Sequence, residues 1–423
     1  MSRLPSHRML LLLALAAPAL ATAQDPHLEK ARRVLQAVPL VDGHNDLPWY
    51  IREDFPQAPR DVEAYDLRTR TAGNTDLERL RRGMVGGQFW SVYIPGEYRD
   101  SGYARVQLEQ IDIARRVIAR YPELSPALTA QDIWTAHAAG RIGSLLGMEG
   151  GHAIENSLGA LRAYYALGVR YMTLTHNVTL DWADAALDEP RHGGLTAFGE
   201  EVVREMNRLG MLVDLSHVSP GAMSDALDVS QAPVIFSHSS ARALADVPRN
   251  VPDSILARLP RNGGVVMVTF VPGFLSQPLI DHTARRGAQL EALQRRMPRD
   301  SAGVARALAQ WDRDNPAPRA TLADVADHIE HVRRVAGVDH VGLGSDFDGT
   351  GNNLPVGLEG VSTFPALLAE LSRRGWSEED LRKVAGENAL RALAQAERTA
   401  ARLQRERPPS TKTIQDLDRK RAS

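Results

Sequence analysis

The chain has 423 residues, of which 43% are hydrophobic and 24% are charged, and its 50 basic and 52 acidic side chains leave a formal net charge of −2. This composition is typical of a globular protein and excludes collagen, coiled coil and disorder. The near-neutral charge balance gives no indication of binding to nucleic acid or anionic lipid. The absence of cysteine excludes disulfides, thiolate metal sites and cysteine nucleophiles.

The first 23 residues have the features of a secretory signal peptide. Basic residues at positions 3 and 8 precede the apolar run 9–17, and the small residues 21–23 suit cleavage before Gln24. This run is too short to span a membrane, although an N-terminal anchor is the alternative, and no later run reaches the ~18 apolar residues that a spanning helix needs. We therefore predict an exported protein, periplasmic or secreted, without a membrane span in the mature chain.

Eight short apolar runs bounded by turn residues predict eight buried strands. They are residues 38–42, 88–94, 142–148, 171–175, 212–215, 234–237, 264–270 and 341–345. The stretches between them show helical periodicity, and alternation of strand and helix predicts a parallel sheet of the α/β class. Eight such units favour closure into a (β/α)8 TIM barrel; an open doubly wound sheet is the alternative.

Two segments depart from this alternation. The connection 271–339 is much longer than an ordinary strand–helix unit and contains the charged stretch 285–299, so we predict a helical insertion after the seventh strand. After residue 400 the chain becomes charged, which predicts a flexible or loosely docked tail. The expected organisation is a signal peptide over 1–23, a catalytic barrel over 24–399 and a tail over 400–423.

Metal-type ligands follow four of the predicted strands. His44 and Asp46 follow the first strand, and residues two apart on an extended chain point the same way, so that both can bind one cation. Glu149 follows the third strand, where a buried carboxylate is costly without a partner. His217 and His238 follow the fifth and sixth strands. Each residue alone is more often a turn, capping or core residue, but a barrel brings all these strand ends together.

These five side chains predict a two-metal site of the kind found in metal-dependent barrel hydrolases. The ligands of the first strand would hold one ion, the two later histidines the other, and Glu149 would contact both. No lysine occurs in any of the eight runs, so a carbamylated lysine cannot bridge the ions. Two cations about 3.5–4 Å apart can hold a bridging hydroxide. Imidazole and carboxylate ligands fit two Zn2+ per chain best, with cobalt or manganese as alternatives.

Other polar residues near the strand ends suggest the remaining catalytic parts. His176, after the fourth strand, is placed to polarise a substrate carbonyl, and Asp346, after the eighth, to carry a proton to a leaving amine. Arg249, in the loop after the sixth strand, is suited to clamp a carboxylate, although it could be a surface arginine. Asp348 is expected to be a turn residue, and His152 to support the ligands without binding metal.

Seven motifs within residues 41–388 resemble the membrane (renal) dipeptidase family of binuclear zinc peptidases. They are DGHND at 42–46, EGGH at 149–152, LTH at 174–176, DLSHVS at 214–219, FSHSS at 236–240, RNVPD at 249–253 and GSDFDG at 344–349. Their order and register make the resemblance specific, and it covers nearly the whole mature chain. It implies an exported bacterial member of the family.

The resemblance implies a dipeptidase that hydrolyses dipeptides, tolerates a C-terminal D-residue and, in some members, opens the β-lactam ring of carbapenems. Carried over position by position, it implies zinc ligands at His44, Asp46, Glu149, His217 and His238, a carbonyl contact at His176, a carboxylate contact at Arg249 and proton transfer at Asp346. A homodimer would also resemble the family, here without a disulfide. This sequence departs from the family's animal members at Phe274, where they carry a tyrosine.

Two alternatives to a dipeptidase stay open on the sequence. One is another binuclear metal-dependent barrel hydrolase, such as a lactonase, a β-lactam or phosphotriester hydrolase, or a deaminase. The other is a non-catalytic exported binding protein that keeps the barrel, which the full set of ligands disfavours.

Overall fold

The computed structural model describes residues 25–351 and 353–418, so the predicted signal peptide lies outside the described residues. The strands are all parallel and pair in the order β2-β1-β9-β8-β7-β6-β5-β4, and pairing of β2 with β4 closes the sheet into an eight-stranded barrel. A ninth strand, β3, pairs with β4. The strands are β1 (Leu40–Asn45), β2 (Val85–Ser91), β3 (Leu124–Pro126), β4 (Ile142–Glu149), β5 (Val169–Thr173), β6 (Leu212–Asp214), β7 (Ile235–Phe236), β8 (Val265–Val268) and β9 (Val341–Leu343).

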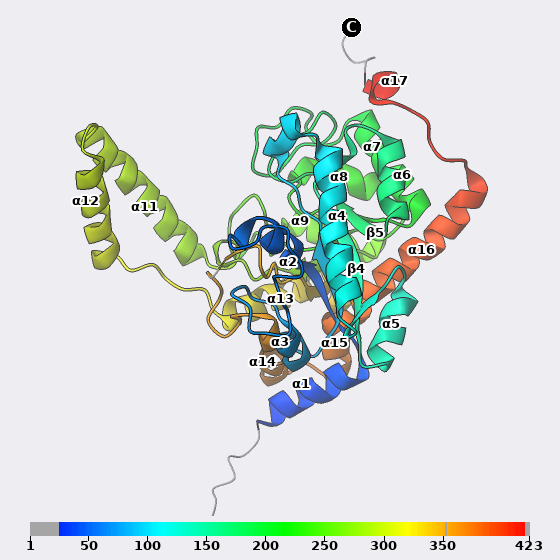
Figure 1. The fold of residues 1–423 in the computed structure, drawn as a ribbon, viewed down its shortest axis with the longest axis horizontal. Helices are drawn as coiled ribbons and strands as arrows, with labels where there is room; N and C mark the ends of the chain where they lie inside the picture. The colour runs from blue at the N-terminus through cyan, green and yellow to red at the C-terminus, as the bar shows by residue number, and fades with distance from the viewer. Residues whose placement is uncertain (1–24, 352, 419–423) are drawn as a thin grey trace, which may run out of the picture.

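Helices surround the barrel and connect its strands (Figure 1). The helices are α1 (Pro26–Ala37), α2 (Leu47–Trp49), α3 (Leu77–Arg82), α4 (Tyr103–Arg120), α5 (Ala130–Ala138), α6 (Leu158–Ala166), α7 (Ala197–Leu209), α8 (Pro220–Val229), α9 (Asp253–Leu256), α10 (Leu259–Asn262), α11 (Gln277–Arg296), α12 (Ser301–Asp314), α13 (Leu322–Ala336), α14 (Phe364–Arg373), α15 (Glu378–Arg382), α16 (Asn388–Glu406) and α17 (Ile414–Asp418). Their ends follow local sequence signals. In α13, Thr321 and Asp324 form a reciprocal capping box, and α7 ends at Gly210 with a positive φ of 85°.

The predicted (β/α)8 barrel is confirmed, because each of the eight apolar runs overlaps one barrel strand. Helices cover the outer face and side chains fill the interior, so both faces of a strand are buried; all eight residues of β4 are buried. This double burial explains why the strands appear in the sequence as continuous apolar runs. The additional strand β3 was not predicted, because it has only three residues and only the first of them is buried.

The helical insertion after the seventh barrel strand, β8, is also confirmed. Helices α11 and α12 form a hairpin that projects away from the barrel (Figure 1). The two helices pack on each other through a small cluster formed by Leu293, Val304 and Leu308. The Arg286 guanidinium also pairs with the Asp312 carboxylate across the hairpin, with an N–O distance of 2.7 Å.

Of the two possibilities left open for the C-terminal segment, a flexible tail and a docked one, the structure shows the docked one. The boundary expected at residue 400 lies inside α16, because the buried side chains of Ala400 and Leu403 continue its apolar face. Helix α17 contacts α7, where Asp418 accepts hydrogen bonds from the Thr196 hydroxyl at 2.7 Å and the Phe198 amide at 3.1 Å. The chain therefore stays docked to the barrel as far as Asp418. None of the helices in the described part of the chain is both long and apolar enough to cross a membrane.

Three phenylalanines form an aromatic cluster beside the end of β9. The rings of Phe270, Phe347 and Phe364 are fully buried, and their centroids lie 5.6 to 5.8 Å apart. Phe347 lies between Asp346 and Asp348 in sequence, so this cluster holds the loop that follows the strand. Packing of this kind both stabilises the barrel and fixes the position of neighbouring polar residues.

We expect Phe364→Ala to lower the free energy of unfolding by about 3–5 kcal/mol, because it removes a fully buried ring and leaves a cavity. Urea denaturation followed by circular dichroism measures this change. The matched control is Leu108→Ala, since Leu108 is 49% exposed and its truncation should change the free energy by less than about 0.5 kcal/mol. Equal stabilities of the two variants would contradict the role of the aromatic cluster.

Candidate metal centre and active site

A cavity of about 600 Å³ opens at the carboxyl ends of the barrel strands. Seven of the eight candidate site residues line it, and they come from six strand ends or the loops that follow: Asp46, Glu149, His176, His217, His238, Arg249 and Asp346. The eighth, His44, is fully buried and lies against Asp46 and Glu149. The structure therefore brings all eight predicted residues together at the end of the barrel where catalytic groups are expected.

One half of the site is built around His44. Its Nε2 atom lies 3.3 Å from Asp46 Oδ2 and 3.5 Å from Glu149 Oε2. Its Nδ1 atom lies 2.8 Å from the Tyr171 hydroxyl, which itself donates to the Gly43 carbonyl at 3.2 Å. This network assigns a proton to Nδ1, so that Nε2 of the neutral ring would direct its lone pair at two carboxylates. A cation between these three groups would satisfy all of them.

The other half of the site is built around the second oxygen of Glu149. Glu149 Oε1 lies 2.8 Å from His217 Nε2 and 3.3 Å from His238 Nε2, and the two Nε2 atoms are 2.9 Å apart. The His217 Nδ1 atom donates to Asn177 Oδ1 at 3.0 Å, and the His238 Nδ1 atom donates to the Ser237 hydroxyl oxygen at 2.8 Å. Both imidazoles thus direct a free lone pair at the same point. Glu149 connects the two halves.

Two buried carboxylates fix the strand ends beneath these histidines. Asp214 accepts from the Ser237 hydroxyl at 2.6 Å, which leaves the Ser237 oxygen free to accept from His238. Asp42 accepts from the amide and the hydroxyl of Ser345, both at 2.7 Å. The first pair ties β6 to β7, and the second ties β1 to the end of β9. These two carboxylates were not among the predicted site residues, although a carboxylate inside an otherwise apolar run was a visible signal for them.

The charge states of the ligands suit metal binding at neutral pH. Burial alone would raise the pKa of Glu149, but the nearby charge of His44 and the close contacts with the imidazoles of His217 and His238 outweigh it and hold this pKa well below its usual range. Burial, reinforced by nearby positive charge, lowers the pKa of His217 and of His238 well below 6.5. The carboxylate is therefore ionised and these two imidazoles are neutral, as metal coordination requires.

The arrangement also fits a cation at His44. Burial opposes protonation of this imidazole, but Tyr171 and the carboxylates of Asp46 and Glu149 outweigh it and raise the His44 pKa well above 6.5. His44 Nε2 and Asp46 Oδ1 are buried without a hydrogen-bond partner. An excess of negative charge and unsatisfied ligand atoms in one place indicate a missing positive charge. The nitrogen and oxygen donors, without thiolate, fit divalent zinc, cobalt or manganese.

Two further histidines lie near this centre but are placed differently. His176 Nε2 lies 4.0 Å from Glu149 Oε1, farther than His217 at 2.8 Å, and its side chain is 15% exposed to the cavity. His176 therefore faces the substrate space, although it is close enough to be an alternative ligand. His152 points away, since its Nε2 atom lies 2.9 Å from the Ile94 carbonyl oxygen.

Arg249 is not a surface residue. It is 1% exposed, lines the cavity, and makes only two long hydrogen bonds, to Ser239 Oγ and the His238 carbonyl, both at 3.4 Å. Among the described residues it forms no ion pair, and the Phe274 ring lies 5.1 Å from its guanidinium carbon. Burial lowers its pKa to about 10, so the guanidinium stays charged at neutral pH. A buried, unpaired cation at a cavity wall is suited to bind an anionic group of a ligand.

The two aspartates after β9 have different surroundings. Asp346 is only partly buried and shares a cluster of possible ligands with His44 and Asp46. Burial together with the negative charges of Asp46 and Glu149 outweighs the opposite effect of His44 and raises the pKa of Asp346 well above 3.8. Asp346 is therefore better suited than an ordinary aspartate to hold a proton. Asp348 exchanges hydrogen bonds with the backbone and side chain of Asn74, at 2.5 and 2.9 Å, as expected for a turn residue.

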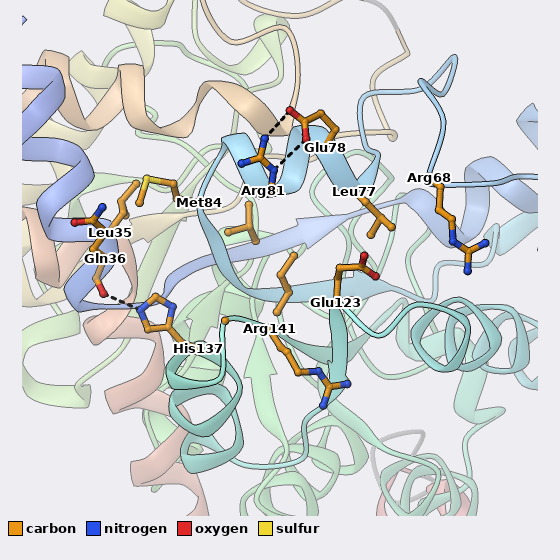
Figure 2. Close-up of a pocket in the computed structure, with 13 residues that line it drawn as sticks. Leu35, Gln36, Arg68, Leu77, Glu78, Arg81, Met84, Glu123, His137 and Arg141 are labelled. Carbon is orange, nitrogen blue, oxygen red and sulfur yellow. Dashed lines mark hydrogen bonds and ion pairs between the residues drawn. The ribbon is translucent and has the colours of Figure 1, made fainter. Parts of the chain in front are cut away.

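A second cavity, of about 550 Å³, lies at the opposite end of the barrel, near the starts of β2 and β4 (Figure 2). Several of its polar side chains are engaged with each other or with backbone: Arg81 pairs with Glu78 at 2.8 Å, and His137 lies 3.4 Å from the Gln36 carbonyl. In the part of the chain that the structure describes, no group of potential metal ligands gathers there. Residues at this end of such a barrel serve stability, so the catalytic site is the first cavity.

The closed barrel and the paired ligand sets at its carboxyl-terminal end define a metal-dependent (β/α)8-barrel hydrolase. Residues 28–407 match the sequence model of the membrane dipeptidases, peptidase family M19. The chain therefore belongs to the membrane dipeptidase family of metallopeptidases, which confirms the resemblance seen in the motifs.

Individual relatives agree with this membership. The chain is 43% identical to Dipeptidase 3 of Rattus norvegicus over 379 residues, which cover 88% of this chain and 68% of the rat protein. A metallo peptidase from Rhodobacter sphaeroides, solved with a phosphinate mimic of the dipeptide L-Ala-D-Ala, aligns with a TM-score of 0.67 and 25% identity over 85% of this chain and 99% of that one. The probable dipeptidase PvdM from Pseudomonas aeruginosa, 24% identical, has the same fold, with a TM-score of 0.74 over 88% of this chain and 99% of that one.

We expect Tyr171→Phe to weaken the binding of divalent metal ions about 10- to 100-fold, because the hydroxyl that orients His44 is lost. Competition between the purified protein and a chromophoric chelator measures this affinity. Tyr164→Phe is the matched control, since it removes a buried hydroxyl that donates to the Ala153 carbonyl, which is not in the ligand set. Identical metal affinities of the two variants would show that the Tyr171 hydroxyl does not support the site.

Proposed function

We propose that this enzyme is a zinc-dependent dipeptidase that binds two Zn2+ per chain and hydrolyses the amide bond of dipeptides, including those with a C-terminal D-residue. The observation that carries the proposal is the position of Glu149, with one oxygen facing His44 and the other facing His217 and His238. The mimic of L-Ala-D-Ala bound to the Rhodobacter sphaeroides relative supports the acceptance of a D-residue.

The ligands divide into two sets that share one carboxylate. His44 and Asp46 would hold the first ion, His217 and His238 the second, and Glu149 both. Bound zinc ions would lower the pKa of a water molecule to about 7 and polarise the substrate carbonyl. The remaining steps fall to groups of the protein that do not bind metal.

Arg249 orients the substrate by binding its free carboxylate. His176 is kept neutral because burial lowers its pKa, and a neutral imidazole can donate a hydrogen bond to the carbonyl oxygen as negative charge develops there. Asp346 accepts the proton of the attacking water and delivers it to the departing nitrogen, because its raised pKa lets it hold a proton between the two steps.

Arg249 also distinguishes a dipeptidase from two of the alternative barrel hydrolases, the lactonase and the phosphotriester hydrolase. Neither a simple lactone nor a phosphotriester carries a free carboxylate, so neither would use a buried cation at this wall. In a dipeptide the carboxylate lies one residue beyond the scissile amide, whereas a longer peptide would present an amide at the same place. Recognition of the carboxylate by Arg249 thus supports a peptide as the substrate and limits its length to two residues.

We further propose export after removal of the signal peptide over residues 1–23, to the periplasm or the medium, and assembly as a homodimer without a disulfide. Export rests on the order of basic, apolar and small residues at the start of the sequence. The dimer rests on family resemblance, and both stay predictions.

Glu149→Gln tests the shared carboxylate. We expect the metal content to fall from about two ions per chain to less than one, because a neutral amide cannot replace a bridging carboxylate. Elemental analysis after gel filtration measures the content, and circular dichroism checks the fold. Glu97→Gln, the same change at an exposed position, should keep two ions. A Glu149→Gln protein that retains two tightly held ions would refute the bridge.

Arg249→Ala tests the recognition of the carboxylate. We expect kcat/KM for a dipeptide such as Ala-Ala to fall about 100-fold, since charge-assisted hydrogen bonds are lost, while hydrolysis of the corresponding dipeptide amide changes little. Steady-state kinetics on the metal-loaded enzyme measures both. Arg242→Ala removes an exposed guanidinium from the same loop and should change neither rate. An equal fall in kcat/KM for the dipeptide and for its amide would show that Arg249 does not recognise the carboxylate.

A further inference from the structure

An aromatic pair on one wall of the active-site cavity has no role in the proposed chemistry. Trp49 follows β1 and Tyr93 follows β2, and both line the cavity and are half-buried. Their rings meet edge to face, with centroids 4.9 Å apart, and Tyr98 lies behind Trp49 at 6.2 Å. The pair is therefore supported from behind and presents apolar surface to whatever occupies the cavity.

The topology of the barrel places this pair opposite Arg249. Tyr93 follows β2 and Arg249 lies in the loop after β7, and these strands are four positions apart in either direction around the closed sheet of eight. A substrate whose carboxylate is bound by Arg249 must therefore extend across the metal centre toward β1 and β2. The Tyr93 ring lies 4.7 Å from the ring of His176, so the aromatic pair adjoins the group that faces the scissile carbonyl.

The two ends of the cavity thus meet different residues of a dipeptide. Phe274 lies beside the Arg249 guanidinium, at 5.1 Å, so it adjoins the C-terminal residue of the substrate. Trp49 and Tyr93 adjoin the N-terminal residue. Apart from Arg249, no arginine or lysine lines the cavity among the described residues, whereas Asp54 lines it and contributes negative charge next to α2. The end of the cavity at Trp49 and Tyr93 therefore favours a substrate with an apolar side chain over one with an acidic side chain.

We propose that Trp49 and Tyr93 form the specificity subsite for the side chain of the N-terminal residue and that they select large apolar, above all aromatic, side chains. Aromatic rings pack well against an edge-to-face pair, and the contact removes apolar surface of both partners from water. The inference rests on the proposed dipeptidase function, because the carboxylate at Arg249 sets the direction of the substrate.

The test compares two matched pairs of dipeptides on the metal-loaded enzyme. Phe-Gly against Ala-Gly varies the N-terminal side chain, and Gly-Phe against Gly-Ala varies the C-terminal one. We expect the wild-type enzyme to prefer Phe-Gly over Ala-Gly by about tenfold in kcat/KM. In Trp49→Ala and Tyr93→Ala this ratio should fall to within about twofold, while the ratio of Gly-Phe to Gly-Ala stays unchanged.

Two further variants make the test specific. Trp49→Phe keeps an aromatic ring and should retain most of the preference for Phe-Gly. Phe274→Ala should show the opposite pattern, with a changed ratio of Gly-Phe to Gly-Ala and an unchanged ratio of Phe-Gly to Ala-Gly. Ratios within one variant are independent of its folded fraction, so partial loss of stability does not affect the result.

The outcomes separate the subsite from the function on which it rests. Hydrolysis of the dipeptides with a ratio of Phe-Gly to Ala-Gly that is unchanged in Trp49→Ala and Tyr93→Ala would overturn the subsite and leave the dipeptidase intact. A change of both ratios together in these variants would also overturn it, since the pair would then act on the whole site. Failure of the metal-loaded wild-type enzyme to hydrolyse any of the four dipeptides would overturn the function and the subsite together.

Discussion

The active site depends on one buried carboxylate, Glu149, which ends β4 and lies among imidazoles from three other strand ends. An ionised carboxylate in a protein interior is costly unless compensating charge is close by. The carboxyl ends of parallel strands supply that compensation, because the barrel brings residues far apart in sequence to one place. Each oxygen of Glu149 faces its own group of ligands, and this division makes a two-ion centre possible.

The orientation of these imidazoles comes from the barrel itself. In His44, His217 and His238 the Nδ1 atom contacts a side chain carried by a strand or by the segment that follows it, and the Nε2 atom faces Glu149. The carboxylates of Asp42 and Asp214 in turn bind the ends of neighbouring strands. A shift of one strand would therefore break a ladder hydrogen bond and misdirect a ligand at the same time. Fold and site are stabilised by the same buried polar contacts.

The sequence predicted the barrel well because double burial makes each strand a continuous apolar run. It also predicted the ligands, since a polar residue at the end of such a run lies at the catalytic end of the barrel. It did not reveal Tyr171, because an aromatic residue within a strand looks like core until its hydroxyl is seen beside His44. The end of the long helix α16 was hidden for a related reason: charged residues after position 400 obscured the apolar face that Leu403 continues.

The distribution of charge around the cavity explains how one site can hold both ends of a zwitterion. Five carboxyl groups line it, from Asp46, Asp54, Glu149, Asp346 and Asp348, against one guanidinium, that of Arg249. Two divalent ions together with Arg249 would offset these negative charges almost completely, so that a substrate without net charge meets a nearly neutral cavity. The substrate is then oriented by the uneven distribution of positive and negative charge within the cavity. The isolated cation on the β7 side attracts a carboxylate, and the aspartates after β1 and β9 attract an ammonium group.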